Sequence, residues 1–292
     1  MAGNQNLPVR QYAPQYKQML STVFDVKKAF EGVVAPIQIL DGVQHNAKAF
    51  AVKTNATPVV VGTYSTDANT SFGTGTGAGS RFGNMTEVIY QDEEVPYSYT
   101  LAIHEGLDRY TVNNDLNAAV ADRLRLQSEA QTREMNKRIG KFLSTNAGET
   151  ENLADLTEAS IKKLFNAVTA YTVNTEINAP MKAYIRAELY NAIIDMASTT
   201  TAKGSSVSLD SNGLLKYKGI ELVETPEKYL ETGTLGIFAP DNIVIAFVGI
   251  NTARTVEATE FDGVHLQAAA KGGTYVLEDN KKAIIKIAGT IA

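Results

Sequence analysis

The sequence predicts an α+β fold, and three observations carry that prediction. An uninterrupted helical pattern runs over 113–143, far beyond the three turns of an average helix. Strand-like segments lie before it, over 36–61 and 86–112, and again over 253–287. Between them, 148–254 alternates short helical and strand patterns, which is typical of a compact α+β unit.

The first part of the chain is polar and basic. Residues 1–11 have no period, and apolar side chains then recur at helical spacing up to a stop near Gly32. These are Tyr16, Met19, Leu20, Val23, Phe24 and Phe30. Residues 1–30 hold four basic groups, among them Arg10 and Lys17, against the single acid Asp25. Two interpretations stay open: a helix docked on its own core, or an arm that reaches a neighbouring molecule.

Strand patterns follow over 36–40 and 49–61, and a glycine-rich segment then covers 62–84, with five glycines within eleven residues. Ordering such a backbone costs roughly 1–2 kcal/mol per residue. Its sizeable apolar side chains are Tyr64, Phe72 and Phe82, each worth about 1.5–3 kcal/mol when buried. We therefore expect this segment either to be mobile or to gain its contacts from another chain.

The residues before the long helix are strand-like and acidic, with Asp92, Glu93 and Glu94 in a row. Asn113 or Asn114 is expected to cap the helix, with Asp115 in its first turn. The polar centre of the helix, 127–133, leaves a narrow apolar stripe, so we expect a strut lying across a sheet. Its basic side chains could face nucleic acid, but four acids share the helix, which favours a solvated or intersubunit salt-bridged face.

The second half predicts helices over 157–172 and 186–197, with a strand over 179–185 between them. A hairpin is expected over 213–225, turning near Gly219. Strands are then expected over 234–239 and 242–248. Three more are expected near 253–258, 264–269 and 273–287, the last with a turn at Asp279 and Asn280.

Composition and motifs exclude several classes of function. The chain of 292 residues contains no cysteine, which removes disulfides and thiolate chemistry. Its longest apolar run, 243–250, is far below the roughly 20 residues of a membrane-spanning helix. The net charge of −5 predicts only weak, non-specific contact with nucleic acid. His104-Glu105 begins like a zinc-protease motif, but Asp108 stands where a second histidine is required. We expect no catalytic residue, no cofactor and no metal.

The order of these parts resembles the Hong Kong 97-type fold of tailed-phage major capsid proteins, which encapsulin shells share. The stretch from Ala179 to Ile194 is similar to the strand and helix of that family's A domain, and Gly272 to Lys286 to its last P-domain strands. The resemblance implies an N-terminal arm over 1–45, an E-loop hairpin over 46–96 and a P domain with a spine helix over 97–147. An inserted A domain then covers 148–254, and P-domain return strands cover 255–292.

The resemblance further implies a structural subunit that self-assembles, as pentamers and hexamers, into an icosahedral head around double-stranded DNA. The expected location is the virion, after assembly in the bacterial host cytoplasm. Expected partners are other copies, a portal, a separate scaffolding protein (because no scaffolding segment precedes the arm) and optionally a decoration protein. No lysine occurs between Lys53 and Lys137, so the loop tip offers none for a cross-link and a non-covalent shell is expected.

The expected intersubunit contacts are Phe72, Phe82, Arg81, Asp92, Glu93, Glu94, Arg10 and Lys17. The basic arm and the spine helix are expected to pair with the acids at 92–94 of another copy. Two alternatives stay open. One is an encapsulin-type compartment shell. The other is a cytosolic α+β enzyme or binding protein with a mobile glycine-rich lid at 62–84, which would be a monomer or small oligomer.

Overall fold

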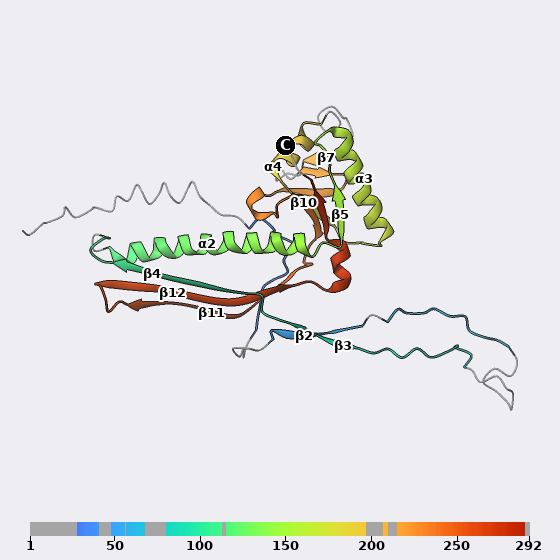
Figure 1. Cartoon of the computed structure of the whole chain (residues 1–292), viewed down its shortest axis with the longest axis horizontal. Coiled ribbons are helices and arrows are strands. Elements are labelled where there is room, and N and C mark those ends of the chain that lie inside the picture. The colour runs from blue at the N-terminus through green and yellow to red at the C-terminus, as the bar shows by residue number, and fades with distance from the viewer. Residues whose placement is uncertain are drawn as a thin grey trace, which may run out of the picture. The chain divides into compact units, whose positions relative to one another are not determined.

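The computed structural model describes residues 28–40, 48–55, 57–67, 80–112, 115–196, 207–209 and 215–289. The chain forms two compact units, shown in Figure 1. We call Val43–Tyr97 the loop unit, and Met1–Gly42 with Ser98–Ala292 the main unit. The greater part of the predicted helix, which was to run from Tyr12 to a stop near Gly32, lies outside the described residues, as do Arg10 and Lys17. Its expected last turn is not helical, because 28–34 form turns and a bridge.

A four-stranded sheet in the order β1-β11-β12-β4 forms one layer of the main unit. The strands are β1 (Gln38–Ile39), β11 (Ile245–Glu257), β12 (Gly263–Tyr275) and β4 (Tyr99–Asp108). The prediction of separate strands over 242–248 and 253–258 is wrong, as is that of a break between 264–269 and 273. The antiparallel register of β11 and β12 runs from Ile245↔Tyr275 to Glu257↔Val264, so one long hairpin replaces four short pieces. A bulge between Val248 and Ile250 absorbs Gly249.

Helix α2 (Leu116–Thr145) lies along β4, and it confirms the predicted strut (Figure 1). Its 30 residues span about 45 Å. The predicted cap is wrong: the Asp115 carboxylate accepts from the Ala118 backbone N–H at 3.2 Å, so Asp115 itself is the N-cap. The last third of α2 packs tightly, since a Cβ on Gly140 would lie 1.9 Å from the carbonyl oxygen of Tyr229.

A seven-stranded sheet in the order β5-β13-β10-β6-β9-β8-β7 forms the second part of the main unit. Its strands are β5 (Glu149–Asn152), β13 (Ile285–Ala288), β10 (Thr234–Pro240), β6 (Met181–Ile185), β9 (Ile220–Glu224), β8 (Leu215–Tyr217) and β7 (Val207–Leu209). Helices α3 (Glu158–Asn174) and α4 (Ala187–Ile194) confirm the two predicted helices, and β8 and β9 confirm the hairpin at Gly219. The short 3-10 helices are η1 (Glu227–Tyr229) and η2 (Glu278–Ala283). Asp279 and Asn280 therefore lie in a 3-10 turn between β12 and β13, where the sequence predicted a turn.

Both faces of this sheet are buried, which explains why β10 is apolar at successive positions from Leu235 to Pro240. On one face, Phe238 and Ala183 pack with Phe165 of α3 and Leu189 of α4. On the other, side chains of β6 and β10 pack with the end of α2 and with residues 30–33. The predicted A-domain boundary at 254 falls inside β11, and 255–292 divides between the two sheets.

Residues 29–33 are anchored in the second core. Phe30 packs against Tyr184, with ring centroids 5.4 Å apart, and the Tyr184 hydroxyl donates to the Glu31 carbonyl at 2.7 Å. The Ala29 N–H donates to the buried side chain of Asn136 on α2 at 3.0 Å. Burial also raises the pKa of Tyr184, which keeps its hydroxyl protonated as a donor. Residues 29–33 are therefore held against β6 and α2 of the main unit.

Candidate assembly surfaces

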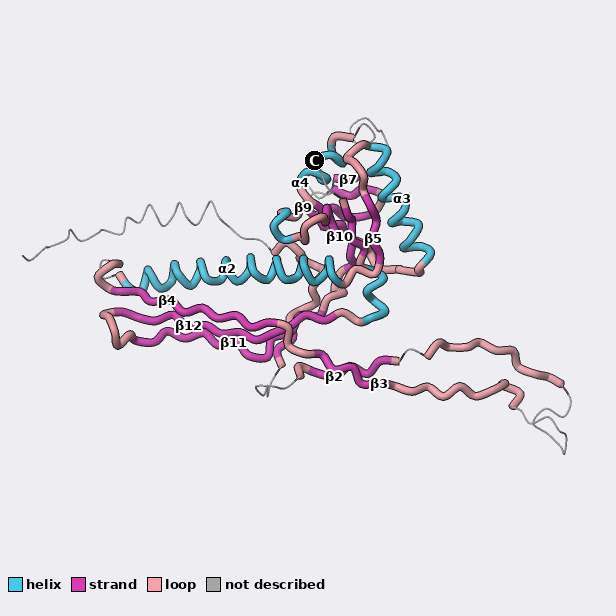
Figure 2. Tube along the Cα trace, in the orientation of Figure 1, coloured by secondary structure: helices cyan, strands magenta, loops and turns pink. Residues whose placement is uncertain are grey.

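The loop unit begins as a two-stranded ribbon. Strand β2 (Phe50–Thr54) pairs antiparallel with β3 (Gln91–Val95), in the register Phe50↔Val95 to Thr54↔Gln91. Beyond Thr54 and before Gln91, the described chain continues as two runs of loop, shown in Figure 2. The strands predicted over 49–61 and 86–112 are therefore wrong over 57–61 and 86–90 in the single chain. The reason is that these segments lack a layer on which to pack.

Large apolar side chains are exposed along both runs. Nine of the sixteen exposed large apolar residues in the described chain belong to the loop unit. These are Val59, Val60, Val61, Tyr64, Phe82, Met85, Val88, Ile89 and Tyr90. Val59 and Val61 are each 91% exposed, and Met85 is 96% exposed. An exposed apolar surface of this extent marks a binding surface.

Phe82, one of the predicted contact residues, lies in the described chain and is 82% exposed. Its ring meets that of Tyr64 edge-on, with centroids 5.1 Å apart. Next to it, the Arg81 carbonyl accepts from the Ser65 N–H at 2.9 Å, and the Arg81 side chain is half-buried. The structure brings these residues together near the outer end of the described runs. Phe72 lies outside the described residues.

The acidic residues at 92–94 lie on β3 and have partners within the loop unit. Asp92 pairs with Lys53 at 3.0 Å, and Glu94 pairs with Lys48. Glu93 stands opposite Val52 in the register. Both ion pairs are more than half exposed, so each contributes little to stability. The predicted pairing of these acids with the basic arm of another copy stays a prediction, and it would have to compete with these two lysines.

The arginines of α2 that the sequence offered as nucleic-acid or intersubunit contacts are also paired within the chain. Arg125 pairs with Asp122 and Glu129, and Arg138 with Glu134, all one turn apart on the helix. These local pairs use the arginines within the chain, which weighs against contact of this part of the helix with nucleic acid.

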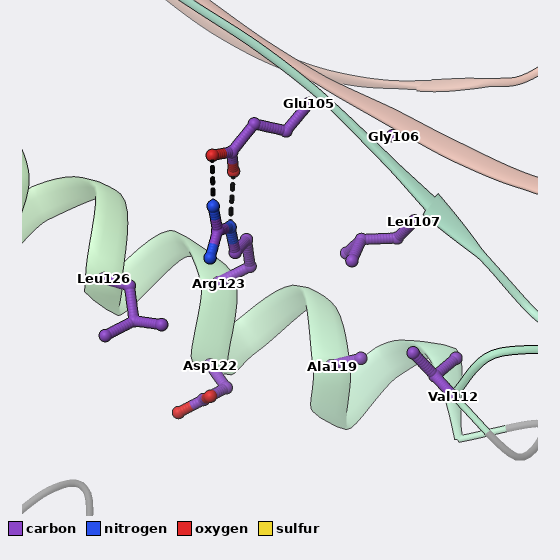
Figure 3. Close-up of a pocket in the computed structure, with 8 residues that line it drawn as sticks. All are labelled: Glu105, Gly106, Leu107, Val112, Ala119, Asp122, Arg123 and Leu126. Carbon is purple, nitrogen blue, oxygen red and sulfur yellow. Dashed lines mark hydrogen bonds and ion pairs between the residues drawn. The ribbon is translucent and has the colours of Figure 1, made fainter.

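A groove lies between the first half of α2 and the end of β4, shown in Figure 3. Its volume is about 550 Å³. It is lined by Glu105, Gly106, Leu107, Val112, Ala119, Asp122, Arg123 and Leu126. Across it, Arg123 donates two hydrogen bonds to Glu105, of 2.5 and 2.6 Å, and the Gln127 side chain donates a third at 2.6 Å. The Arg123 hydrogen bond lowers the pKa of Glu105, so the carboxylate stays charged and ties helix to sheet.

Two of the chain's three histidines face each other on the four-stranded sheet, with ring centroids 5.3 Å apart: His104 on β4 and His265 on β12. The third, His45, lies outside the described residues. Gln267 bridges Arg254 and His104, and His265 pairs with Glu260 at 3.1 Å. Within the described ranges, no cluster of three or more histidine, aspartate or glutamate side chains could hold a metal ion. In the same ranges, no helix is long and apolar enough to cross a membrane.

We compared the chain with known proteins by sequence and by structure. No family model matches the chain, and no curated protein matches its sequence. Solved structures do match. The mature capsid of bacteriophage PhiM1 gives a TM-score of 0.67 at 8% identity, over 92% of this chain and 89% of that one. A structure from Mycobacterium phage Che8 gives a TM-score of 0.58 at 13% identity, over 82% and 83%. The chain has the Hong Kong 97-type capsid fold. The SrpI encapsulin of Synechococcus elongatus matches as well, with a TM-score of 0.52 at 12% identity, over 94% of each chain.

The sequence indicated only part of the exposed apolar surface on the loop unit of this Hong Kong 97-type chain. It selected the aromatic residues at 72 and 82 and treated Val59–Val61 and Val88–Tyr90 as ordinary strands. Three consecutive valines give apolar side chains on both faces of an extended chain, because neighbours alternate in direction. The three valines therefore indicate a segment whose two faces both become buried when another surface packs against it. The groove between α2 and β4 had no signal in the sequence, since its lining is brought together only by tertiary packing.

Proposed function

We propose that this protein is the major capsid protein of a tailed bacteriophage, which assembles into an icosahedral head around double-stranded DNA. The proposal rests on one observation: the loop unit of a chain with the Hong Kong 97-type fold exposes nine large apolar side chains. In this proposal the protein acts by structure alone, without catalysis.

The energetics of the loop unit support assembly. Burying one of these side chains yields about 1.5–3 kcal/mol. All nine are exposed in the single chain, so their burial between subunits would strongly stabilise an assembly. A sister copy is the partner that is always present in equal amount. Contacts between a loop on one copy and a different surface on the next are heterologous, and they close into rings and shells when the rotation between copies closes.

The parts of the chain take roles that follow from this assembly. We assign 1–45 as the arm and 46–96 as the E-loop. The four-stranded sheet with α2 forms the P domain, and the seven-stranded sheet with α3 and α4 forms the A domain. A-domains of neighbouring copies would meet at the five-fold and six-fold positions. A portal and a scaffolding protein would complete the head, with a decoration protein as an optional addition. The virion is then the site of the mature protein, after assembly in the host cytoplasm.

An encapsulin-type compartment is the second candidate, favoured by the likeness to the SrpI encapsulin. The two candidates predict different contents. A phage head packages nucleic acid, whereas an encapsulin holds protein cargo. The net charge of −5 fits a wall that contacts packaged DNA weakly and without sequence preference.

The test is expression of the full chain in a bacterium, followed by size-exclusion chromatography and negative-stain microscopy. The expected result is closed particles of megadalton mass. Nuclease-treated particles from infected or induced host cells are then analysed for DNA and for co-purifying proteins. Protected double-stranded DNA supports the phage head, and a stoichiometric cargo enzyme supports the encapsulin. A monomer or small oligomer at every concentration contradicts both shell candidates and favours an enzyme or binding protein with a lid.

A further inference from the structure

Helix α2 lies along one face of the four-stranded sheet, and a row of polar side chains lies on the other face. Side chains alternate between the two faces along a strand. Glu105 of β4 reaches Arg123 of α2 (Figure 3), so the neighbouring His104 lies on the face away from the helix. Its register partner on β12, Gln267, and the partner of Gln267 on β11, Arg254, lie on that face too.

The row crosses three strands and is joined by side-chain hydrogen bonds. Nε of Arg254 donates to Oε1 of Gln267 at 2.8 Å, and Nε2 of Gln267 lies 3.3 Å from Nε2 of His104. An arginine side chain stays protonated and can only donate, so the amide oxygen of Gln267 must face it. The amide nitrogen of Gln267 therefore faces His104. Because that nitrogen is also a donor, Nε2 of His104 must accept.

The row therefore fits one form of His104, the neutral imidazole with its proton on Nδ1. A proton on Nε2, in the other tautomer or in the charged form, would place two donors 3.3 Å apart. Gln267 cannot turn its amide over to accept that proton, because its nitrogen would then face the Arg254 guanidinium. The donor at one end of the row thus decides which protonation state fits at the other end.

His265 lies beside the row, with its ring centroid 5.3 Å from that of His104, and its surroundings suit a positive charge. Nε2 of His265 lies 3.1 Å from Oε2 of Glu260, and its ring meets that of Phe261 edge-on, with centroids 5.0 Å apart. The hydrogen bond from His265 lowers the pKa of Glu260, which keeps this carboxylate charged. A charge on His265 thus has a partner, whereas a charge on His104 would face an amide donor.

The other charged groups around this face lie farther from the row. Asp108 and Lys271 are each four residues along their strands from it, or about 13 Å. The Asp108 carboxylate accepts from the Tyr110 N–H at 2.9 Å. Near the turn that joins β11 to β12, Asp262 pairs with Arg109 at 3.5 Å. These contacts engage the two aspartates away from the row.

We propose that the row is an acid-sensitive latch: Arg254, Gln267 and His104 link β11, β12 and β4 while His104 is neutral, and the link breaks when His104 takes up a proton. Between about pH 8 and pH 5 an imidazole passes from neutral to charged. Mild acid would thus change both the links between these strands and the charge of this face. The latch lies within one subunit, so this inference does not rest on the proposed function.

Nuclear magnetic resonance of the imidazole nitrogens tests the closed state. Unassembled subunits carry ¹⁵N-labelled histidine, and replacing each of the three histidines in turn by glutamine assigns the signals. At pH 8, His104 should carry its proton on Nδ1. In Arg254→Met this preference should disappear, because the Gln267 amide can then turn over. A proton on Nε2 of wild-type His104, or the same preference in the variant, would overturn the inference.

The variant Gln267→Glu should reverse the requirement of the row. A carboxylate accepts from Arg254 and from a charged His104 alike, so the pH at which half of His104 is charged should rise by about one pH unit or more. The matched control is Gln131→Glu, which adds the same charge at an exposed position of α2 and should leave that pH nearly unchanged. An equal midpoint in Gln267→Glu and the wild type would overturn the latch.

Unfolding by urea at two pH values tests the open state. Gln267→Met keeps a side chain of similar length and removes the row. At pH 8 this variant should unfold at a lower urea concentration than the wild type. At pH 5 the two midpoints should coincide, because the wild-type row is then already broken. An equal difference at both pH values, or none at pH 8, would overturn the latch. A chain that forms no particles would remove the proposed function and leave these measurements valid.

Discussion

Replacing two exposed valines of the loop unit, Val59→Ser with Val61→Ser, should weaken assembly and leave the subunit itself unchanged. Each side chain is 91% exposed in the single chain, so neither contributes to its stability. In a shell, each valine that becomes covered loses about 1.5 kcal/mol on replacement by serine, at about 0.8 kcal/mol per CH₂. The two together weaken each subunit's contacts by about 3 kcal/mol. Since 1.4 kcal/mol is a factor of ten, the critical assembly concentration should rise about 100-fold.

The assay is light scattering of purified subunits over a dilution series, with urea unfolding of the unassembled form as a second measurement. The free energy of unfolding should change by less than about 0.5 kcal/mol. Val173→Ser is the matched control, because Val173 is 70% exposed on α3, far along the chain from the loop unit. An unchanged critical concentration for the double variant would refute burial of these valines by another copy. An equal rise for the control would refute the special role of the loop.

Three further predictions concern the main unit, all measured by chemical unfolding of the unassembled subunit. Glu105→Gln should cost about 1 kcal/mol at pH 7. Because Arg123 lowers the folded pKa of Glu105, this stabilisation is present above the unfolded pKa and is lost as the pH falls through the folded pKa. A difference between the two proteins that does not shrink as the pH is lowered below the unfolded pKa would contradict it. Gly140→Ala should cost at least 2 kcal/mol by the order-of-magnitude cost of overpacking, whereas Gly62→Ala, with open space around it, should change stability little; equal effects would contradict the close approach. Asp115→Ala should cost about 1 kcal/mol through loss of the N-cap, and an unchanged stability would show that water replaces it.

The sequence predicted the elements best where a single local pattern decides the structure. The long helix, the helices α3 and α4 and the hairpin at Gly219 all follow from periodicity or turn chemistry within a few residues. The prediction was wrong where a distant partner decides the structure. The 13-residue strands β11 and β12 contain glycines and alanines that break the local pattern, and only their mutual register makes each continuous.

For the candidate assembly surface too, the sequence predicted the residues that local composition decides and missed the contacts that distant residues decide. Exposed aromatic and acidic residues of the loop could be selected from composition, because a glycine-rich segment cannot bury them at home. The ion pairs of Asp92 with Lys53 and Glu94 with Lys48 could not be foreseen, since they depend on a strand register set across some forty residues. The valine run at 59–61 could be read from the sequence. That it does not form a strand in the single chain could not, because this depends on the lack of a layer that packs on it.

The mass of the purified protein in solution tests the central claim most directly. Sedimentation velocity on the wild-type chain, over a thousandfold range of concentration, should show a sharp transition from subunits to one closed species of megadalton mass. A single species near 31.5 kDa at all concentrations, with amides 59–63 and 84–90 protected from exchange, would contradict the account. That result would mean that the loop unit forms its hydrogen bonds and buries its apolar side chains within one chain, without another copy.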